Sequence, residues 1–452
     1  MPADLFPLGG RDRSWNAHAD NFLRANRPHL EALDIRAELV GTPEEIGLQL
    51  KPGGTIGAVP LRAPDSWRIG GGVVVRPRFG WNDIGPLLHT VGWAASPRIL
   101  AQPLVPGSAR EVPPWVLAGP VLQRLGRLLQ EIRRGFRMQE EVRTQPRGQI
   151  MWQQYLRQQM ARGAFHQLPC RFPELGPDLL LRAYLRWGLQ RVNAALLPYS
   201  GIDPVARRLV EQAQLLVQQV QDIAPRVPDR RALDQLLHDA GLPSEYLLRG
   251  LEALGWLAED RGLAGLAETD GLAWSLRMHE LFECWVEHLV GCWAHRIGGQ
   301  LASGRRGQTV FPIHWRRPAA GSLSSLVPDL IVRTKAAVFI FDAKYKGHFE
   351  EFDDRRWASL REEMQAEHRH DLHQILAYAA LFGAPRVVSV LVYPMHGASW
   401  RRLAERDRVV TPATLTSAGR QLGLALVGVP MELRGDQSAH GITRAWSMFS
   451  SN

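Results

Sequence analysis

The sequence has few cysteines and no long apolar run. Its 452 residues include three cysteines, too few and too scattered for a disulfide framework. No apolar run approaches the roughly 18 residues that a membrane-spanning helix needs, and no secretory signal opens the chain. With 45% apolar residues, the chain can nevertheless build full cores. We therefore expect a soluble, cytoplasmic protein with no membrane partner.

Lysine is also scarce, because arginine carries nearly all of the positive charge. None of the four lysines follows a glycine, so the Gly-Lys step of a Walker A phosphate-binding loop is absent. Any nucleotide-driven motor must therefore be another chain. The formal charge of +9 and the repeated arginine pairs favour an anionic partner such as DNA. A GC-rich genome that encodes arginine in place of lysine would give the same composition.

Residue patterning divides the chain into three predicted domains, with an α+β fold class overall. Residues 1–115 are predicted to be β-rich, 116–265 to form a helical linker domain, and 266–452 to form an α/β domain with a C-terminal tail. The predicted strands of the first domain are 46–50, 56–61 and 72–78, followed by a helix over 81–93. The predicted helices of the second are 121–137, 149–161, 178–197 and 204–220, with two shorter ones within 227–257.

The stretch 328–346 has the clearest chemical pattern. Its two apolar segments, 330–332 and 336–341, are rich in β-branched or aromatic residues and are predicted to pair as a β-hairpin. A two-residue loop at 334–335 would set the register. Three of the four lysines lie in this stretch: Lys335, Lys344 and Lys346. A compact ammonium can shift its pKa where a guanidinium cannot, so a lysine at position 344 indicates a chemical role.

Three polar side chains converge at one end of this hairpin. The predicted register places Asp329 opposite Ile340 and diagonally across from Asp342, on the face that also carries Lys344. Two carboxylates this close raise each other's pKa unless a divalent cation lies between them. Hard oxygen ligands favour Mg²⁺, with Mn²⁺ as a substitute, and Lys344 would hold the water that attacks a phosphodiester. The alternative is a solvated edge hairpin.

Predicted helices lie on both sides of the hairpin. The upstream helix, 275–295, carries three glutamates on one face: Glu280, Glu283 and Glu287. A solvated helix face would show the same pattern. The downstream helix, 371–378, is predicted to turn Leu372, Ile375 and Leu376 inward. It carries Gln374 and Tyr378 one turn apart, which is also compatible with an ordinary amphipathic helix.

Two groups of potential soft-metal ligands offer an alternative site. The first recurs every four residues along the upstream helix: Cys284, His288 and Cys292. The second lies near the downstream helix: His368, His370 and His373. A zinc site needs four ligands, so buried small side chains and solvated or phosphate-contacting histidines are the favoured interpretations.

The hairpin resembles the PD-(D/E)xK nuclease superfamily, whose motif is matched by Pro328-Asp329 and Asp342-Ala343-Lys344. The resemblance implies that Asp329, Asp342 and the Ala343 carbonyl hold the metal, and that Glu283 completes or water-bridges the site. Gln374 and Tyr378 match the Gln-x-x-x-Tyr element of nucleases related to the RecB group, which implies that Gln374 orients the site or a phosphate. Lys346 and Tyr345 remain open as DNA contacts or strand-end residues.

A second resemblance, to McrC-type proteins, covers most of the chain. It rests on the order of several segments before the nuclease motif: 71–80, 84–88, Arg147-Gly148-Gln149-Ile150, 169–175 and 180–189. Arg76-Pro77-Arg78 departs from the usual Pro-Lys pair, and Leu175 stands where asparagine is expected. The resemblance implies the nuclease subunit of a modification-dependent restriction system. It also implies that the amino-terminal region docks on a McrB-type AAA+ GTPase or ATPase.

We therefore predict a Mg²⁺-dependent endodeoxyribonuclease subunit that acts in defence against foreign DNA. The predicted catalytic residues are Asp329, Asp342, Lys344, Glu283 and Gln374. One alternative is a non-catalytic adaptor, in which a nuclease-like fold binds DNA and stimulates a partner NTPase. Another is an enzyme that works without a motor.

Overall fold

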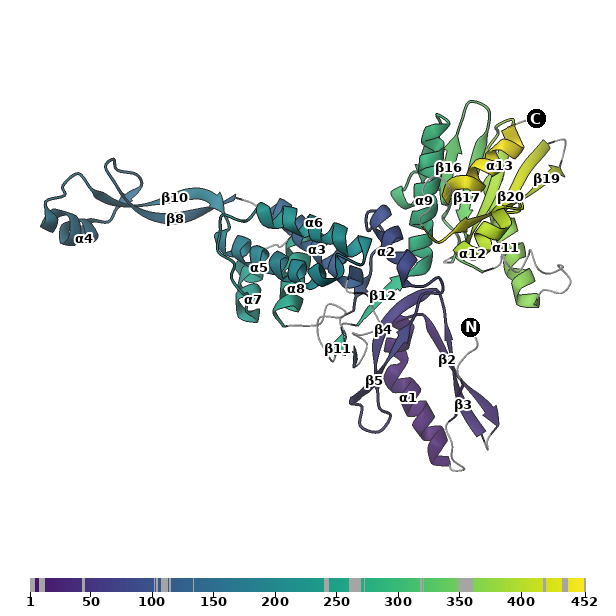
Figure 1. Cartoon of the computed structure of the whole chain (residues 1–452), viewed down its shortest axis with the longest axis horizontal. Helices are drawn as coiled ribbons and strands as arrows, with labels where there is room; N and C mark the ends of the chain where they lie inside the picture. The colour runs from purple at the N-terminus through teal and green to yellow at the C-terminus, as the bar shows by residue number, and fades with distance from the viewer. Residues whose placement is uncertain are drawn as a thin grey trace. The chain divides into compact units, whose positions relative to one another are not determined.

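The chain divides into two compact units in the computed structural model (Figure 1). One unit comprises Met1–Ser108 and Thr269–Asn452, and the other Ala109–Glu268. The division into three domains stays a prediction. Within the described residues, no helix combines the length and hydropathy needed to cross a membrane. The structure describes residues 5–7, 13–42, 45–100, 102, 105–106, 113, 115–132, 134–239, 244–259, 270–271, 273–317, 319, 321–347, 349, 361–417, 420–432 and 438–450.

The amino-terminal part of the first unit is built mainly from strands, and the strands predicted there are found. The sheets of this part that the structure describes have the orders β1-β3-β2, β5-β4-β12-β6 and β11-β7. The predicted helix 81–93 is α2 (Trp81–Thr90). The other elements are β1 (Leu5–Pro7), α1 (Arg13–Ala32), β2 (Ile35–Thr42), β3 (Glu45–Pro52), β4 (Thr55–Arg62), β5 (Ile69–Val75), β6 (Arg98–Ile99), β7 (Val105–Pro106), β11 (Asp270–Gly271) and β12 (Trp274–Arg277).

Gly57 permits the close pairing of β4 with β12. It lies opposite Ser275, its φ is 150°, and a Cβ at this position would overlap the Trp274 carbonyl oxygen. We expect Gly57→Ala to destabilise the protein by about 1–3 kcal/mol, because the added methyl forces the strands apart. Urea unfolding would measure this loss. Gly71→Ala in β5 is the matched control, since nothing lies within 4 Å of its Cβ position. Equal effects of the two substitutions would contradict the prediction.

The second unit contains a helical bundle. The side chains of Asp178 and Asp203 accept hydrogen bonds from the first backbone N–H groups of α5 and α6, which fixes where these helices begin. Apolar stripes at helical spacing face the bundle core. The helices are α3 (Trp115–Glu131), α5 (Leu179–Leu196), α6 (Pro204–Gln218), α7 (Arg230–Asp239) and α8 (Glu245–Ala258).

The prediction of a purely helical middle region is wrong at two places. The helix predicted over 121–137 ends at Glu131, and β8 (Arg134–Arg143) follows and pairs antiparallel with β10 (Leu168–Pro177) along its whole length (Figure 1). Apolar and polar residues alternate through β8, which is the period of a strand. Within the predicted helix 149–161, β9 (Gln149–Ile150) pairs with β10 before short helical turns begin at α4 (Trp152–Gln154).

A six-stranded sheet forms the C-terminal part of the first unit, in the order β13-β16-β17-β18-β20-β19. β17, β18 and β20 run parallel, and the other pairs are antiparallel. Helix α11 packs on β17 and β18, while α9 and α13 pack on the sheet and on each other. The elements are α9 (Met278–Arg296), β13 (Gln300–Ser303), β14 (Phe311–Pro312), β15 (Ser325–Leu326), β16 (Leu330–Arg333), β17 (Val338–Ala343), α11 (Glu362–Ala379), β18 (Val387–Met395), α12 (Gly397–Ala404), β19 (Val410–Ser417), β20 (Arg420–Pro430) and α13 (His440–Ser450).

Strand alternation in β17 sends its side chains toward different helices. Phe339 and Phe341 contact Trp293 of α9, with ring centroids 5.5 and 5.7 Å apart. Asp342 belongs to the other face, because successive side chains of a strand point to opposite sides. The core packing of Trp293 thus fixes the face on which the acid lies. The structure therefore confirms a mixed α and β fold.

The predicted hairpin exists, but its loop is longer than expected. Leu330 pairs with Phe341 and Arg333 with Val338, so four residues, 334–337, connect the strands. The Thr334 hydroxyl accepts hydrogen bonds from the Ala336 and Ala337 N–H groups and donates to the Ala337 carbonyl. This bonding stabilises the wider turn. The register differs from the predicted one by two residues, which keeps the acids on one face and places them directly opposite each other.

The helix predicted to begin at Ser275 begins instead at Met278. Residues 274–277 form β12, which pairs with β4 on one side and with β6 on the other. Ser275 and Leu276 are buried in this sheet. The prediction is wrong for these residues because an apolar run of this length is compatible with either a strand or the start of a helix.

Candidate active site

Asp329 and Asp342 lie opposite each other, where β16 begins and β17 ends. The Ala343 N–H donates a hydrogen bond of 2.8 Å to Asp329 Oδ2. Asp342 is 1% exposed. Its close contact is an ion pair with Lys344 Nζ at 2.7 Å.

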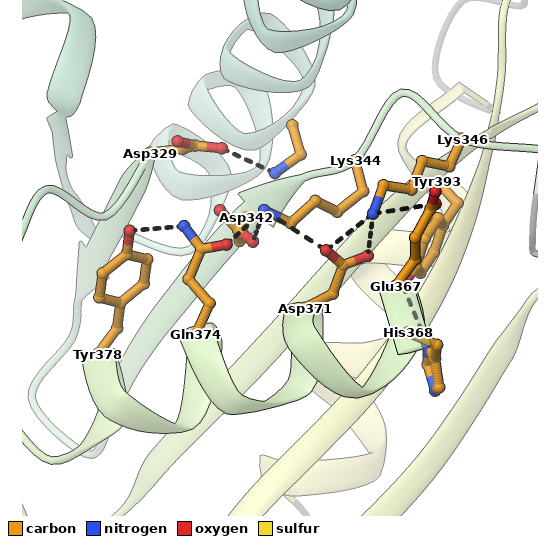
Figure 2. Close-up of polar contacts among 11 residues, drawn as sticks. Asp329, Asp342, Lys344, Lys346, Glu367, His368, Asp371, Gln374, Tyr378 and Tyr393 are labelled. Atoms are coloured by element: carbon orange, nitrogen blue, oxygen red, sulfur yellow. Dashed lines mark hydrogen bonds and ion pairs between the residues drawn. The ribbon is translucent and has the colours of Figure 1, made fainter. Parts of the chain in front are cut away.

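Helix α11 holds Lys344 from the other side (Figure 2). Lys344 Nζ donates to Gln374 Oε1 at 2.8 Å, and Gln374 Nε2 donates to Tyr378 Oη at 2.9 Å. The two α11 residues are one helical turn apart, so they follow one another along the face that meets the strand. The structure thus brings Asp329, Asp342, Lys344 and Gln374 together. Ile375 is buried in the core, while Leu372 and Leu376 are half-buried.

Burial governs the charges of these groups. It raises the pKa of Asp329 to about 8, together with the nearby charge of Asp342, while the Ala343 hydrogen bond opposes the shift. Burial also raises the pKa of Asp342, although the charge of Lys344 lowers it. For Lys344, burial lowers the pKa, but the charges of Asp342 and Asp371 outweigh it and the net shift is upward. Without a cation, the pair of acids therefore favours a shared proton at neutral pH.

These shifts predict how stability depends on pH without a divalent cation. The pKa of Asp329 rises from 3.8 unfolded to about 8 folded, so between these values the folded state binds more protons. The contribution of protonated Asp329 to the free energy of unfolding is therefore fully present below about pH 4 and is lost as the pH rises through about 8. We expect wild-type protein in EDTA to lose stability from pH 5 to pH 8 relative to Asp329→Asn, measured by urea unfolding. Parallel pH curves for the two proteins would contradict this.

Glu283 lies near the two acids, whereas the other glutamates of its helix face are engaged elsewhere. Arg98 and Arg277 contact Glu280 at 3.1 and 3.0 Å, and Arg306 contacts Glu287 at 3.0 Å. Glu283 is half-buried, and its pKa is raised by burial and, to a smaller degree, by the charges of Glu280 and Asp342. The three predicted glutamates thus differ in environment: Glu280 and Glu287 pair with arginines, whereas Glu283 lies near Asp342.

The sequence interpretation missed Asp371. This residue is 1% exposed, and its two carboxylate oxygens each accept a hydrogen bond of 3.0 Å from Lys346 Nζ. Lys346 is therefore paired with an acid inside the protein. Tyr345 packs edge-on against Phe79 and beside Phe282, each with ring centroids 6.1 Å apart. The spacing of Asp371 and Gln374, one helical turn apart, is the signal that would have identified the acid.

The proposed soft-metal groups do not assemble. His368 is buried with its Nδ1 3.4 Å from Tyr393 Oη, whereas His370 and His373 are exposed. Cys284 is buried and burial raises its pKa to about 11, while Cys292 is exposed. Among the described residues, no three His, Cys, Asp or Glu side chains are grouped as metal ligands. Burial of Cys284 and exposure of His370 and His373 agree with the favoured interpretations, whereas Cys292 is exposed and His368 is buried, contrary to them.

A cavity of about 660 Å³ adjoins Gln374 and Tyr378. It lies between α11 and the segment that includes β15, and its walls are mostly apolar. The exposed His370 and His373 stand on its α11 side. The remaining lining residues are Leu323, Ser325, Leu326, Val327 and Ala377.

The acids suit a hard divalent cation. Two carboxylates, one buried and one half-buried, face each other, and burial raises the pKa of both. Mg²⁺ commonly takes one or two protein carboxylates and completes its shell with water and phosphate oxygens. Asp329 and Asp342 would hold it together with the Ala343 carbonyl. Among the residues that the structure describes, Glu283 is not grouped with both acids as a third direct ligand.

Comparisons with known proteins give a matching family and similar solved structures. A family model described as McrBC 5-methylcytosine restriction system component matches residues 116–394, more than half of the chain. One similar structure is a refined half-complex from a tetradecameric assembly of Thermococcus gammatolerans McrB AAA+ hexamers with bound McrC. The identity is 14% and the TM-score 0.39, with 99% of this chain and 98% of that chain covered.

A second similar structure is the cryo-EM structure of the Thermococcus gammatolerans McrBC complex. Its identity is 14% and its TM-score 0.29, with 64% of this chain and 85% of that chain covered. A comparison with the curated proteins gives no match.

Proposed function

The chain belongs to the McrBC 5-methylcytosine restriction system component family, and we propose that it is the Mg²⁺-dependent DNA endonuclease subunit of such a system. The observation that carries this proposal is the opposed pair of Asp329, which is half-buried, and Asp342, which is buried, with Lys344 Nζ 2.7 Å from the second acid. We propose on the same grounds that the predicted domain 266–452 has a PD-(D/E)xK core. A purely structural site would gain nothing from two carboxylates that repel each other out of full contact with water.

Each residue has a distinct role in the proposed hydrolysis. Mg²⁺, when bound, supplies a Lewis acid and lowers the pKa of a bound water. Asp329 and Asp342 hold the cation from opposite strands. Lys344 orients the attacking water and offsets the charge that develops on the phosphate. Gln374 accepts a hydrogen bond from Lys344 and donates one to Tyr378, so it fixes the direction of the ammonium group.

We propose that a separate McrB-type AAA+ NTPase is the partner, because the chain has no Gly-Lys step for a phosphate-binding loop. The amino-terminal region, 1–115, is one candidate docking surface. A second lies beyond the ends of β8 and β10, where Trp152, Leu156 and Phe165 are 60%, 53% and 62% exposed. Large apolar side chains exposed together commonly mark a protein interface.

The second surface gives a direct prediction. We expect Trp152→Ser/Phe165→Ser to weaken co-purification of the NTPase at least about 10-fold, because the variant removes apolar area that binding would bury. Tyr246→Ser/Leu248→Ser on α8, which removes side chains 41% and 44% exposed, is the matched control. Undiminished co-purification would show that this surface does not bind the NTPase and would leave residues 1–115 as the candidate docking surface.

Plasmid cleavage tests the proposed function. The purified chain is incubated with methylated supercoiled DNA, the partner NTPase and nucleotide, with Mg²⁺ or with EDTA. We expect nicked or linear plasmid in the reaction with Mg²⁺ and none in the reaction with EDTA. DNA binding and NTPase stimulation without cleavage under any condition would overturn the proposal in favour of a non-catalytic adaptor. Cleavage without the NTPase would show that no motor is required.

A further inference from the structure

A buried carboxylate without a role in the proposed hydrolysis lies beside the site. Asp371 is on α11, one turn before Gln374, and its side chain points toward the end of β17 (Figure 2). It is 1% exposed, and Lys346 Nζ donates to both of its oxygens at 3.0 Å. A charge this deeply buried is strongly unfavourable unless an opposite charge holds it. Lys346 supplies that charge.

Asp371 is also within reach of the proposed catalytic lysine. Lys344 Nζ is 4.0 Å from Asp371 Oδ1 and 2.7 Å from Asp342 Oδ2. It therefore lies between two buried carboxylates, and the carboxylate with the less neutralised charge attracts it more strongly. While Lys346 neutralises Asp371, the stronger attraction is toward Asp342.

The backbone brings both ammonium groups to the same helix. The Lys344 N–H donates to the Val392 carbonyl at 2.8 Å, which extends the pairing of β17 with β18 by one residue. The Lys346 N–H then donates to the Lys344 carbonyl at 2.7 Å. The chain bends there, and Lys346 reaches Asp371 and, at 3.5 Å, the more exposed Glu367. The two lysines are thus held side by side with separate acids.

We propose that Lys346 is a positioning residue for Lys344. By neutralising Asp371, it keeps the Lys344 ammonium on Asp342 and Gln374, where the reaction needs it. The inference rests on the proposed nuclease function of the same site. Lys346 acts through Lys344 and requires no contact with DNA.

Two variants test this inference. Lys346→Met leaves Asp371 charged, with Lys344 as the nearest cation. We expect its crystal structure to show Lys344 Nζ within hydrogen-bond distance of Asp371 and withdrawn from Asp342. We expect kcat for cleavage to fall at least about 10-fold with KM unchanged. Adding Asp371→Asn removes the competing charge, so the double variant is expected to recover kcat to within about 3-fold of wild type.

Lys335→Met is the matched control, because Lys335 is exposed in the hairpin loop. Lys344 remaining on Asp342 in the crystal structure of Lys346→Met would overturn the inference, whether or not the wild type cleaves DNA. A raised KM with unchanged kcat and no rescue would do the same, since it indicates a DNA contact. If Lys346→Met does not fold, the test rests on kcat of the double variant, in which neither charge of the Lys346–Asp371 pair remains. Failure of the nuclease proposal would appear separately, as absence of cleavage by the wild type.

Discussion

Replacing Asp342 with asparagine is expected to reduce DNA cleavage by at least about 1000-fold, since the cation then has one carboxylate fewer and Lys344 loses its ion-pair partner. Asparagine has nearly the same volume, so the packing of this 1% exposed side chain is preserved. Initial rates of plasmid nicking with the partner NTPase present would measure the loss. Asp234→Asn, at an exposed position on α7, is the matched control.

The same substitution is expected to raise stability in the absence of divalent cations. Burial disfavours the charged form of Asp342, as the direction of its pKa shift shows, and a neutral amide escapes this penalty. The unfolding midpoint in EDTA at pH 8 should therefore increase, and the stabilisation that added Mn²⁺ gives the wild type should disappear. A variant that is less stable in EDTA, or that cleaves DNA at the wild-type rate, would contradict the assignment of Asp342 as a metal ligand.

Replacing Lys344 with methionine is expected to lower cleavage about 100- to 1000-fold while leaving cation binding nearly intact. Methionine keeps the length and apolar stem of lysine but cannot hold a water or offset phosphate charge. Lys344→Arg is expected not to restore activity, because a planar guanidinium cannot reproduce the compact contacts to Asp342 and Gln374, at 2.7 and 2.8 Å. Single-turnover cleavage and Mn²⁺ titration would separate the two effects.

Lys335→Met serves as the control for this series, because it removes the same charge from the opposite end of the same hairpin. Wild-type cleavage by Lys344→Met would show that the lysine only neutralises Asp342. A loss of Mn²⁺ binding equal to the loss of cleavage would show that it organises the cation site instead of acting in the reaction.

The grouping of Asp329, Asp342, Lys344 and Gln374 was predictable from the sequence because these residues follow strand and helix periods. Alternation in β17 places Asp342 and Lys344 on one side, and a slip of two residues in hairpin register does not change that side. The loop length was not predictable in the same way. It depends on hydrogen bonds of the Thr334 hydroxyl, and a two-residue loop and a four-residue loop fit the same apolar pattern.

Asp371 escaped prediction because its environment is tertiary. Its place one turn before Gln374 in the predicted helix 371–378 was visible in the sequence, but only the fold shows that it is covered and contacts Lys346. The strands β8 and β10 were missed for a related reason. The residues that pair between them are more than twenty positions apart in the chain, so the pairing is not a local feature of the sequence.

The strand β12 limits where the chain can be cut. It hydrogen-bonds with β4 on one edge and β6 on the other, and the next residue, Met278, begins α9, the helix of Glu283. A fragment that starts near residue 266 would carry β12 with both of its edges unpaired. Trp274 and Leu276, which are buried in the whole chain, would be exposed to solvent. Such edges invite pairing between copies. Preparations of the nuclease part alone are therefore expected to aggregate unless residues 45–100 are supplied as a second chain or retained by fusion.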